Sequence, residues 1–173
     1  RLTDQYYYVP DSNFYGLDTV LYNVSDGNSE SEEAEVIITV GAVNDMPTAS
    51  IETNNLELPE NSTISGTVLM DDVDGDLVHL QILQNPSNGS IVNFDSDNGT
   101  FTYQPNHYFV GFDNFSVYAE EVDTDDNLKS EILTIGFSVN DINYPPESFD
   151  QWITMFEDDT LYFNMGGQDI DGD

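Results

Sequence analysis

The feature that most constrains the fold of this chain is an internal repeat, whose three landmarks recur in the same order. Residues 8–18, with their Tyr-Val-Pro and Gly-Leu-Asp segments, recur as residues 103–113 at a displacement of 95. Residues 36–44 recur as 135–143 at a displacement of 99, and residues 72–76 recur as 169–173 at 97. Loop insertions explain this drift, so the pattern indicates tandem units of about 95 residues.

The landmarks also set the expected unit boundaries. One complete unit is expected over residues 44–142. Residues 1–43 are then the C-terminal half of a preceding unit, and residues 143–173 are the N-terminal part of the next one. The chain begins without Met and stops inside an acidic motif, so we expect it to be a piece of a longer protein.

Apolar and polar residues alternate through the complete unit, as they do around Leu133, Ile135 and Phe137. This period of two predicts strands with one buried face, and no amphipathic helix of useful length is found. Turn residues divide the pattern into seven expected strands: 48–58, 63–69, 77–84, 90–94, 100–104, 113–119 and 131–140. Seven short strands predict an all-β fold of tandem seven-stranded immunoglobulin-like Greek-key sandwiches. An odd number of alternating strands places the two ends of a unit at opposite poles, so the units stack into a rod.

Composition excludes several classes of function. The chain carries 34 acidic and 2 basic residues, for a net charge of −32. Binding to nucleic acids or anionic membranes needs Lys and Arg, and no apolar run approaches the roughly 20 residues of a membrane span. A content of 38% hydrophobic and 12% aromatic residues argues against disorder. Because Cys is absent from the sequence, disulfides and thiolate metal sites are also excluded.

Acidic and amide side chains are expected at both poles of the complete unit. We call the boundary between residues 1–43 and 44–142 the first junction, and the boundary between 44–142 and 143–173 the second junction. Following the strands from pole to pole gathers one group at the first junction: Asp18, Asn44, Asp45, Asp72, Asp74 and Glu121. The same procedure gathers a second group at the second junction: Glu60, Asp113, Asp141, Asn143, Asp169 and Asp171.

Such crowded carboxylates repel one another, or raise their own pKa values, unless a cation lies among them. The available ligands are all oxygens, and neither His79 nor His107 lies in these motifs. This chemistry favours Ca²⁺, which takes 6 to 8 oxygen ligands. The Asp-x-Asp-Gly-Asp segment is not an EF-hand, because the twelfth position counted from Asp72 is Leu83 and flanking helices are missing.

The chain resembles the cadherin superfamily, and especially the cadherin-like tandem repeats of large microbial surface proteins. The resemblance covers essentially the whole chain. It rests on the turn at 59–61, the linkers at 43–47 and 141–146, the two Asp-x-Asp-Gly-Asp segments, and the Gly-x-Asp segments at 16–18 and 111–113. It implies interdomain calcium at both junctions. The implied ligands are Asp18, Asn44, Asp72 and Asp74 at the first junction, and Glu60, Asp113, Asp141, Asn143, Asp169 and Asp171 at the second.

The sequence departs from the cadherin pattern in both linkers. The first linker has Ala42 where the second has Asp141, and the second has Tyr144 where the first has Asp45. We therefore expect fewer or more weakly held ions than in animal cadherins. The Asp-Arg-Glu pattern of the family is also absent, which leaves Asp18 and Asp113 as the least secure ligands.

Other conspicuous residues receive structural interpretations. Asp95 and Asp97 are expected at a hairpin tip that turns at Asn98-Gly99. A further group of acids is expected in solvated loops and strand edges: Glu30, Glu32, Glu33, Glu35, Asp123, Asp125 and Asp126. The tyrosines at 6–8, 103 and 108 are interpreted as core and corner residues, with a sugar-stacking platform as the alternative. Trp152 is interpreted as a core residue.

These observations predict a non-enzymatic, calcium-stiffened structural or adhesive repeat of an extracellular or cell-surface protein, acting as a spacer or stalk. Its expected partners are neighbouring repeats or copies of itself. The alternative function is a module that binds glycans or surface proteins. A head-to-tail polymer, in which residues 1–43 of one copy complete a sandwich with 143–173 of another, is a further alternative.

Overall fold

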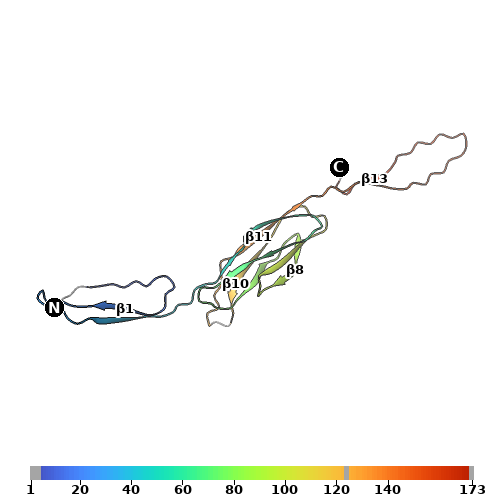
Figure 1. Cartoon of the computed structure of the whole chain (residues 1–173). Helices are drawn as coiled ribbons and strands as arrows, with labels where there is room; N and C mark the ends of the chain where they lie inside the picture. The colour runs from blue at the N-terminus through green and yellow to red at the C-terminus, as the bar shows by residue number, and fades with distance from the viewer. Residues whose placement is uncertain (1–4, 123–124, 172–173) are drawn as a thin grey trace.

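The computed structural model describes residues 5–122 and 125–171, and it is built from strands, turns and loops. Figure 1 shows an elongated molecule with an N-terminal hairpin, a central sandwich and a C-terminal arm. The hairpin and the arm leave the sandwich at opposite ends. This arrangement matches the prediction that an odd number of strands places the two ends of a unit at opposite poles.

The central sandwich has two layers. One layer is a four-stranded sheet of order β4-β11-β10-β7, and the other contains the sheet β5-β9-β8 and the pair β3-β6. Strands β4 and β11 are parallel, whereas the other neighbours are antiparallel. The strands are β3 (Thr48–Ser50), β4 (Asn55–Pro59), β5 (Ile64–Thr67), β6 (Leu69–Asp71), β7 (Val78–Gln84), β8 (Gly89–Asp95), β9 (Thr100–Pro105), β10 (Gly111–Glu121) and β11 (Leu133–Asn140).

The all-β sandwich prediction is confirmed, but the first two expected strands are each broken in two. The strand expected over 48–58 becomes β3 in one layer and β4 in the other. The strand expected over 63–69 is interrupted at Val68, whose N–H donates to the carbonyl oxygen of Gly99 at 2.9 Å. In 63–69 the apolar alternation keeps its phase across the break, so the sequence pattern does not reveal it. In 48–58 the polar run 52–55 separates Ala49 and Ile51 from Leu56 and Leu58, which are out of phase with them, and the sequence interpretation did not use this signal.

The core lies between the two layers and is aromatic at its centre. Phe115, Val117 and Ala119 alternate along β10 and are fully buried, as the period of two predicted. The ring of Phe137 stacks on Tyr103 with centroids 3.8 Å apart, and on Phe115 at 5.8 Å. These contacts fix β9, β10 and β11 relative to one another, and therefore fix the poles that those strands reach.

The flanking segments repeat parts of the central unit. Strands β1 (Gly16–Tyr22) and β2 (Ala34–Val40) pair as β10 and β11 do. The short strands β12 (Glu147–Ser148) and β13 (Gly167–Gln168) pair as β3 and β6 do. Backbone geometry repeats as well, because Gly16 has φ +123° and its counterpart Gly111 has φ +129°.

The interpretation of Tyr6, Tyr7 and Trp152 as core residues is wrong. Their side chains are 86%, 92% and 94% exposed, whereas Tyr103 is fully buried as expected. For Tyr6 the reason is that the described part of residues 1–43 lacks the opposing sheet. The displacement of 95 makes Tyr6 the counterpart of Phe101, which is buried at 2% where a second layer is present.

Replacing Gly99 with Ala is expected to destabilise the central unit by roughly 1–3 kcal/mol. Gly99 has φ +67°, and an added Cβ would lie 2.1 Å from the carbonyl oxygen of Val68. Gly41→Ala is the matched control, since nothing lies within 4 Å of its added Cβ. Urea denaturation followed by circular dichroism measures both variants, and equal midpoints would contradict the prediction.

Candidate functional site

Three carboxylates converge at the second junction. Oxygen atoms of Glu60, Asp141 and Asp171 all lie within 4.8 Å of one another. Glu60 follows β4 and Asp141 follows β11, and these strands are parallel neighbours that end with Pro59 beside Asn140. The N–H of Glu60 donates to the carbonyl oxygen of Asn140 at 2.8 Å. The parallel pairing therefore places two acids from distant sequence positions side by side at one pole.

The side chain of Glu60 is held in this position, because it is only 3% exposed. Its Oε1 accepts a hydrogen bond from the N–H of Ile142 at 3.3 Å, and its Oε2 accepts one from Asn61 Nδ2 at 3.4 Å. The described residues supply no basic side chain to neutralise the cluster. The one lysine, Lys129, pairs with Glu120 at 2.9 Å, and Arg1 lies outside the described residues.

At the first junction, the Asp-x-Asp-Gly-Asp loop is bound to the linker. Asp72 Oδ1 accepts the N–H of Asp74 at 2.9 Å, and Asp74 Oδ2 accepts the N–H of Asp45 at 2.7 Å. Asn44 Nδ2 donates to the buried Glu121 at 2.9 Å. The structure thus brings together five of the six predicted residues of this junction.

The same hydrogen-bond pattern recurs at the second junction. The N–H of Asp171 donates to Asp169 Oδ1 at 2.9 Å, and the N–H of Tyr144 donates to Asp171 Oδ2. Asn143 lies in the linker, where its Nδ2 donates to the carbonyl oxygen of Tyr144 at 3.3 Å. Gly172 and Asp173, which complete the second motif, lie outside the described residues. Both acidic loops are therefore attached to their linkers through equivalent backbone hydrogen bonds.

Asp76 is a functional candidate that the sequence interpretation left out of the ligand set. Burial raises the pKa of its carboxyl, and the charges of Asp72, Glu121 and Asp74 raise it further, in that order. In addition, Oδ2 of Asp72 is buried without a hydrogen-bond partner. The N-terminal pole of the central unit thus concentrates negative charge that its own hydrogen bonds do not neutralise.

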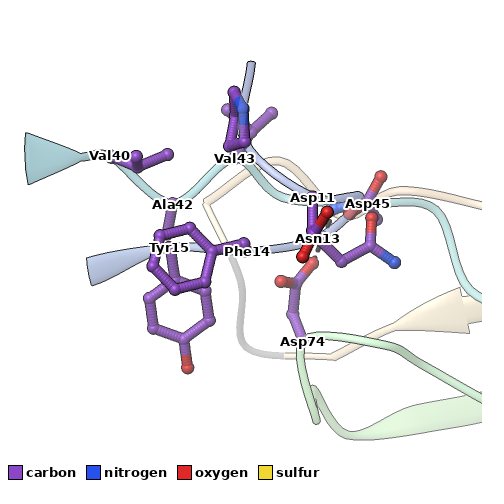
Figure 2. A pocket seen from close by; sticks show the side chains of 11 residues that line it. Asp11, Asn13, Phe14, Tyr15, Val40, Ala42, Val43, Asp45 and Asp74 are labelled. Carbon is purple, nitrogen blue, oxygen red and sulfur yellow. Dashed lines mark hydrogen bonds between the residues drawn. The ribbon is translucent and has the colours of Figure 1, made fainter. Parts of the chain in front are cut away.

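A cavity of about 270 Å³ lies at the first junction, and Figure 2 shows the side chains that line it. Asp11 and Asn13, from the turn before β1, lie in it beside Asp45 and Asp74. The sequence interpretation missed Asp11 and Asn13. Alignment of the two repeat copies could have indicated them, because Asp11 replaces the equivalent Asn106 with an acid and Asn13 replaces the equivalent Tyr108 with an amide.

Asp18 and Asp113 occupy a different environment from the junction acids. Asp113 is 3% exposed and accepts hydrogen bonds from the N–H groups of Ser87 and Asn88 and from the Tyr103 hydroxyl, at 3.0, 2.8 and 3.0 Å. Asp18 repeats this arrangement by accepting the Tyr8 hydroxyl at 2.7 Å. Burial and the bond to Asp113 raise the pKa of Tyr103, whereas the bond from Tyr8 lowers the pKa of Asp18. Both carboxylates lie within hydrogen-bond networks of their own units.

The hairpin between β8 and β9 turns as predicted. Asp95 Oδ1 accepts the N–H groups of Asp97 and Asn98, both at 3.0 Å. His79 Nε2 lies 3.3 Å from Asp97 Oδ1. Glu30, Glu32, Glu33, Glu35, Asp125 and Asp126 are exposed, as expected for solvated acids, while Asp123 lies outside the described residues.

Comparison with known proteins identifies the kind of repeat. A family described as "Bacterial Ig domain" matches residues 2–39 and 44–136. Among curated protein sequences, none matches this chain. Within residues 5–122 and 125–171, no helix has the length and apolar character that crossing a bilayer requires.

Several solved structures are similar to this chain. Human CDH23 EC21-23 is similar with a TM-score of 0.52 and 22% identity, over 87% of this chain and 55% of that one. Human mucin-like protocadherin EC1-2 gives a TM-score of 0.47 and 14% identity, over 78% and 73%. An endo-fucoidan hydrolase of glycoside hydrolase family 107 gives 0.39 and 20%, over 74% of this chain and 19% of the enzyme. The chain spans about half of the CDH23 structure, and that similarity confirms the cadherin-like fold.

Replacing Asp76 with Asn is expected to raise the melting temperature at pH 7 in the presence of a chelator. Because the folded-state pKa of Asp76 is raised above 3.8, ionisation of this carboxyl destabilises the folded state. The gain in melting temperature is fully present above the folded-state pKa of Asp76. It disappears as pH falls below about 3.8, where Asp76 is protonated in both the folded and the unfolded state.

Asp95→Asn is a control of opposite sign. Hydrogen bonds from the Asn98 side chain and from the N–H groups of Asn98 and Asp97 lower the pKa of Asp95, so its charge stabilises the folded state. This variant is expected to melt lower at pH 7, and the difference shrinks as pH falls through the folded-state pKa. Thermal melts from pH 3 to 7 measure both variants, and shifts of equal sign at pH 7 would contradict the account.

Proposed function

Because the chain belongs to the bacterial Ig domain family, we propose that it is an extracellular structural repeat whose junctions are stiffened by calcium. In this role it acts as a spacer or stalk in a surface protein or filament. The proposed units are 1–43, 44–142 and 143–173. The cadherin-like fold and the separation of the two poles support this role, since each unit meets the next through a short linker.

The convergence of Glu60, Asp141 and Asp171 within 4.8 Å is the single observation that carries the proposal. Two carboxylates about 5 Å apart repel by about 1 kcal/mol in bulk water, and by about 3 kcal/mol at an effective dielectric constant of 20. Since Lys129 is paired elsewhere, this repulsion acts against a closed junction. A divalent cation among the three oxygens would reverse its sign.

The available donors fit Ca²⁺. They are carboxylate and amide oxygens, which is the chemistry that Ca²⁺ prefers, and water molecules can complete its 6 to 8 ligands. At the second junction the proposed ligands are Glu60, Asp141 and Asp171, with Asn143 and Asp169 adjacent. At the first junction they are Asn44, Asp45, Asp72, Asp74 and Glu121. We leave Asp18 and Asp113 out of the proposed sets, because their carboxylates accept hydrogen bonds within their own units.

The proposed mechanism is electrostatic. Without calcium, the carboxylates at each junction repel one another, and this repulsion acts against a single orientation of the linker. With calcium, acids of both units share an ion, and the linker is restricted to one orientation. Millimolar calcium is a property of extracellular fluids, so the proposed location is outside the cell. The role requires no catalytic group, and we propose none.

A binding module is the second candidate function. The exposed side chains of Tyr6, Tyr7 and Trp152 favour it, because aromatic rings provide stacking surfaces for sugars. The counterpart of Tyr6 in the central unit, Phe101, is covered by a second sheet, however, so the exposure of Tyr6 has a simpler structural cause. Binding of the chain to a glycan array would support the second candidate.

Saturating calcium is expected to raise the free energy of unfolding by about 2.7 kcal/mol at 100 times the dissociation constant. It should also lengthen and stiffen the molecule in small-angle X-ray scattering. The double variant Glu60→Gln, Asp141→Asn should lose the part of the calcium-dependent stabilisation that the second junction contributes. Asp97→Asn, at an exposed hairpin tip, is the control and should respond like the wild type. Identical scattering and melting of the wild type with calcium and with chelator would reject the proposal.

A further inference from the structure

Among the differences between the two linkers, one equivalent position carries Asp45 in the first linker and Tyr144 in the second. Tyr144 contacts both units that it connects. Its hydroxyl accepts a hydrogen bond from Asn61 Nδ2 at 2.8 Å, and its ring packs edge-on against Tyr108, with centroids 5.9 Å apart and an interplanar angle of 88°. Its backbone N–H donates to Asp171 Oδ2 in the next unit.

The surface that receives Tyr144 is itself fixed. Asn61 uses both ends of its amide, because Oδ1 accepts the N–H of Tyr108 at 2.9 Å while Nδ2 donates to Tyr144. Asn61 and Tyr108 both have positive φ, 55° and 57°, so two tight turns meet at this point. The ring of His107 lies 3.8 Å from that of Tyr108. Tyr144 therefore docks on a prearranged platform at the C-terminal pole of the central unit.

The first junction uses the equivalent positions differently. The repeat makes Asn13 the counterpart of Tyr108, and the two share a positive φ of 60° and 57°. Asn13 and Asp45 line the cavity with Asp11 and Asp74, as Figure 2 shows. Where the second junction has a contact between two aromatic rings, the first junction has a cavity lined on one side by these acidic and amide groups and elsewhere by Phe14 and Tyr15.

We propose that Asn61, Tyr108 and Tyr144 form a clasp that orients the second junction without a cation. The clasp holds Asp171 and its loop against the central unit, so the two junctions of this chain respond differently to calcium. The different calcium responses of the two junctions rest on the proposed function. The contacts of Asn61, Tyr108 and Tyr144 do not depend on it. A hydrogen bond and an aromatic contact each shift a two-state equilibrium by roughly twofold to tenfold.

Spin-label distances measured in the full chain with chelator test the clasp. The sequence contains no Cys, so each pair of Cys substitutions is labelled without background from other thiols. Labels at exposed Gln104 and Asp150 report on the second junction, and labels at exposed Thr39 and Gln81 report on the first. In the wild type with chelator, the second-junction distribution is expected to be narrow and the first-junction distribution broad.

Variants of Tyr144 separate the contribution of the aromatic ring from that of the hydroxyl group. Tyr144→Ala removes both contacts without adding charge, and it is expected to broaden the second-junction distribution to the width of the first. Tyr144→Phe retains the ring and is expected to give an intermediate width. An unchanged melting temperature of the central unit shows that the sandwich itself is intact.

The outcomes distinguish the clasp from the calcium proposal. In chelator, the clasp proposal is wrong if the second-junction distance distribution of Tyr144→Ala is as narrow as that of the wild type. It is also wrong if the wild-type distance distributions of the two junctions are equally broad. If calcium fails to narrow the first junction of the wild type, the proposed function fails, whereas the comparison of Tyr144 variants in chelator still tests the clasp. Recovery of a narrow distribution by Tyr144→Ala on adding calcium would support both.

Discussion

The repulsion between carboxylates that meet where one sandwich ends and the next begins is the interaction on which this structure depends. The chain carries a net charge of −32, and its described lysine is already paired with Glu120. A sandwich tolerates acids on a solvated face at little cost, because water screens them. It does not tolerate a nearly buried Glu60 beside Asp141 and Asp171 as easily. The charge at the junctions is therefore the feature that needs an explanation, and the proposed calcium role supplies one.

The fold creates this charge problem by its strand order. Because β4 runs parallel to β11, the residues after both strands emerge at the same pole, next to the linker. The acidic loop of the following unit is then attached to that linker by a backbone hydrogen bond, as it is at the first junction. The two junctions share this scaffold but differ in side chains, with Asn13 and Asp45 at one and Tyr108 and Tyr144 at the other. The same backbone arrangement thus presents acidic and amide side chains at the first junction and an aromatic contact at the second.

Much of this arrangement could be predicted from the sequence, because the repeat and the strand count together fix which residues share a pole. That logic placed Glu60 near Asp141 and Asp171, and Asn44 near Glu121. It failed where local geometry decides. The break within 63–69 leaves no mark on the apolar alternation, and Asp11 and Asn13 reach the first junction only through a tight turn. The positions of Asp18 and Asp113 depend on hydrogen bonds from Tyr8 and Tyr103, which strand tracing does not reveal.

The proposed stiffening depends on ions that neighbouring units share, so direct observation of those ions is the strongest test. Crystals of this chain grown in millimolar calcium, with anomalous scattering recorded to locate the metal, provide that measurement. The account predicts calcium bound by oxygens of Glu60, Asp141 and Asp171 at distances of about 2.3–2.6 Å. Electron density showing these three side chains turned into solvent, with no ion between the units, would contradict it.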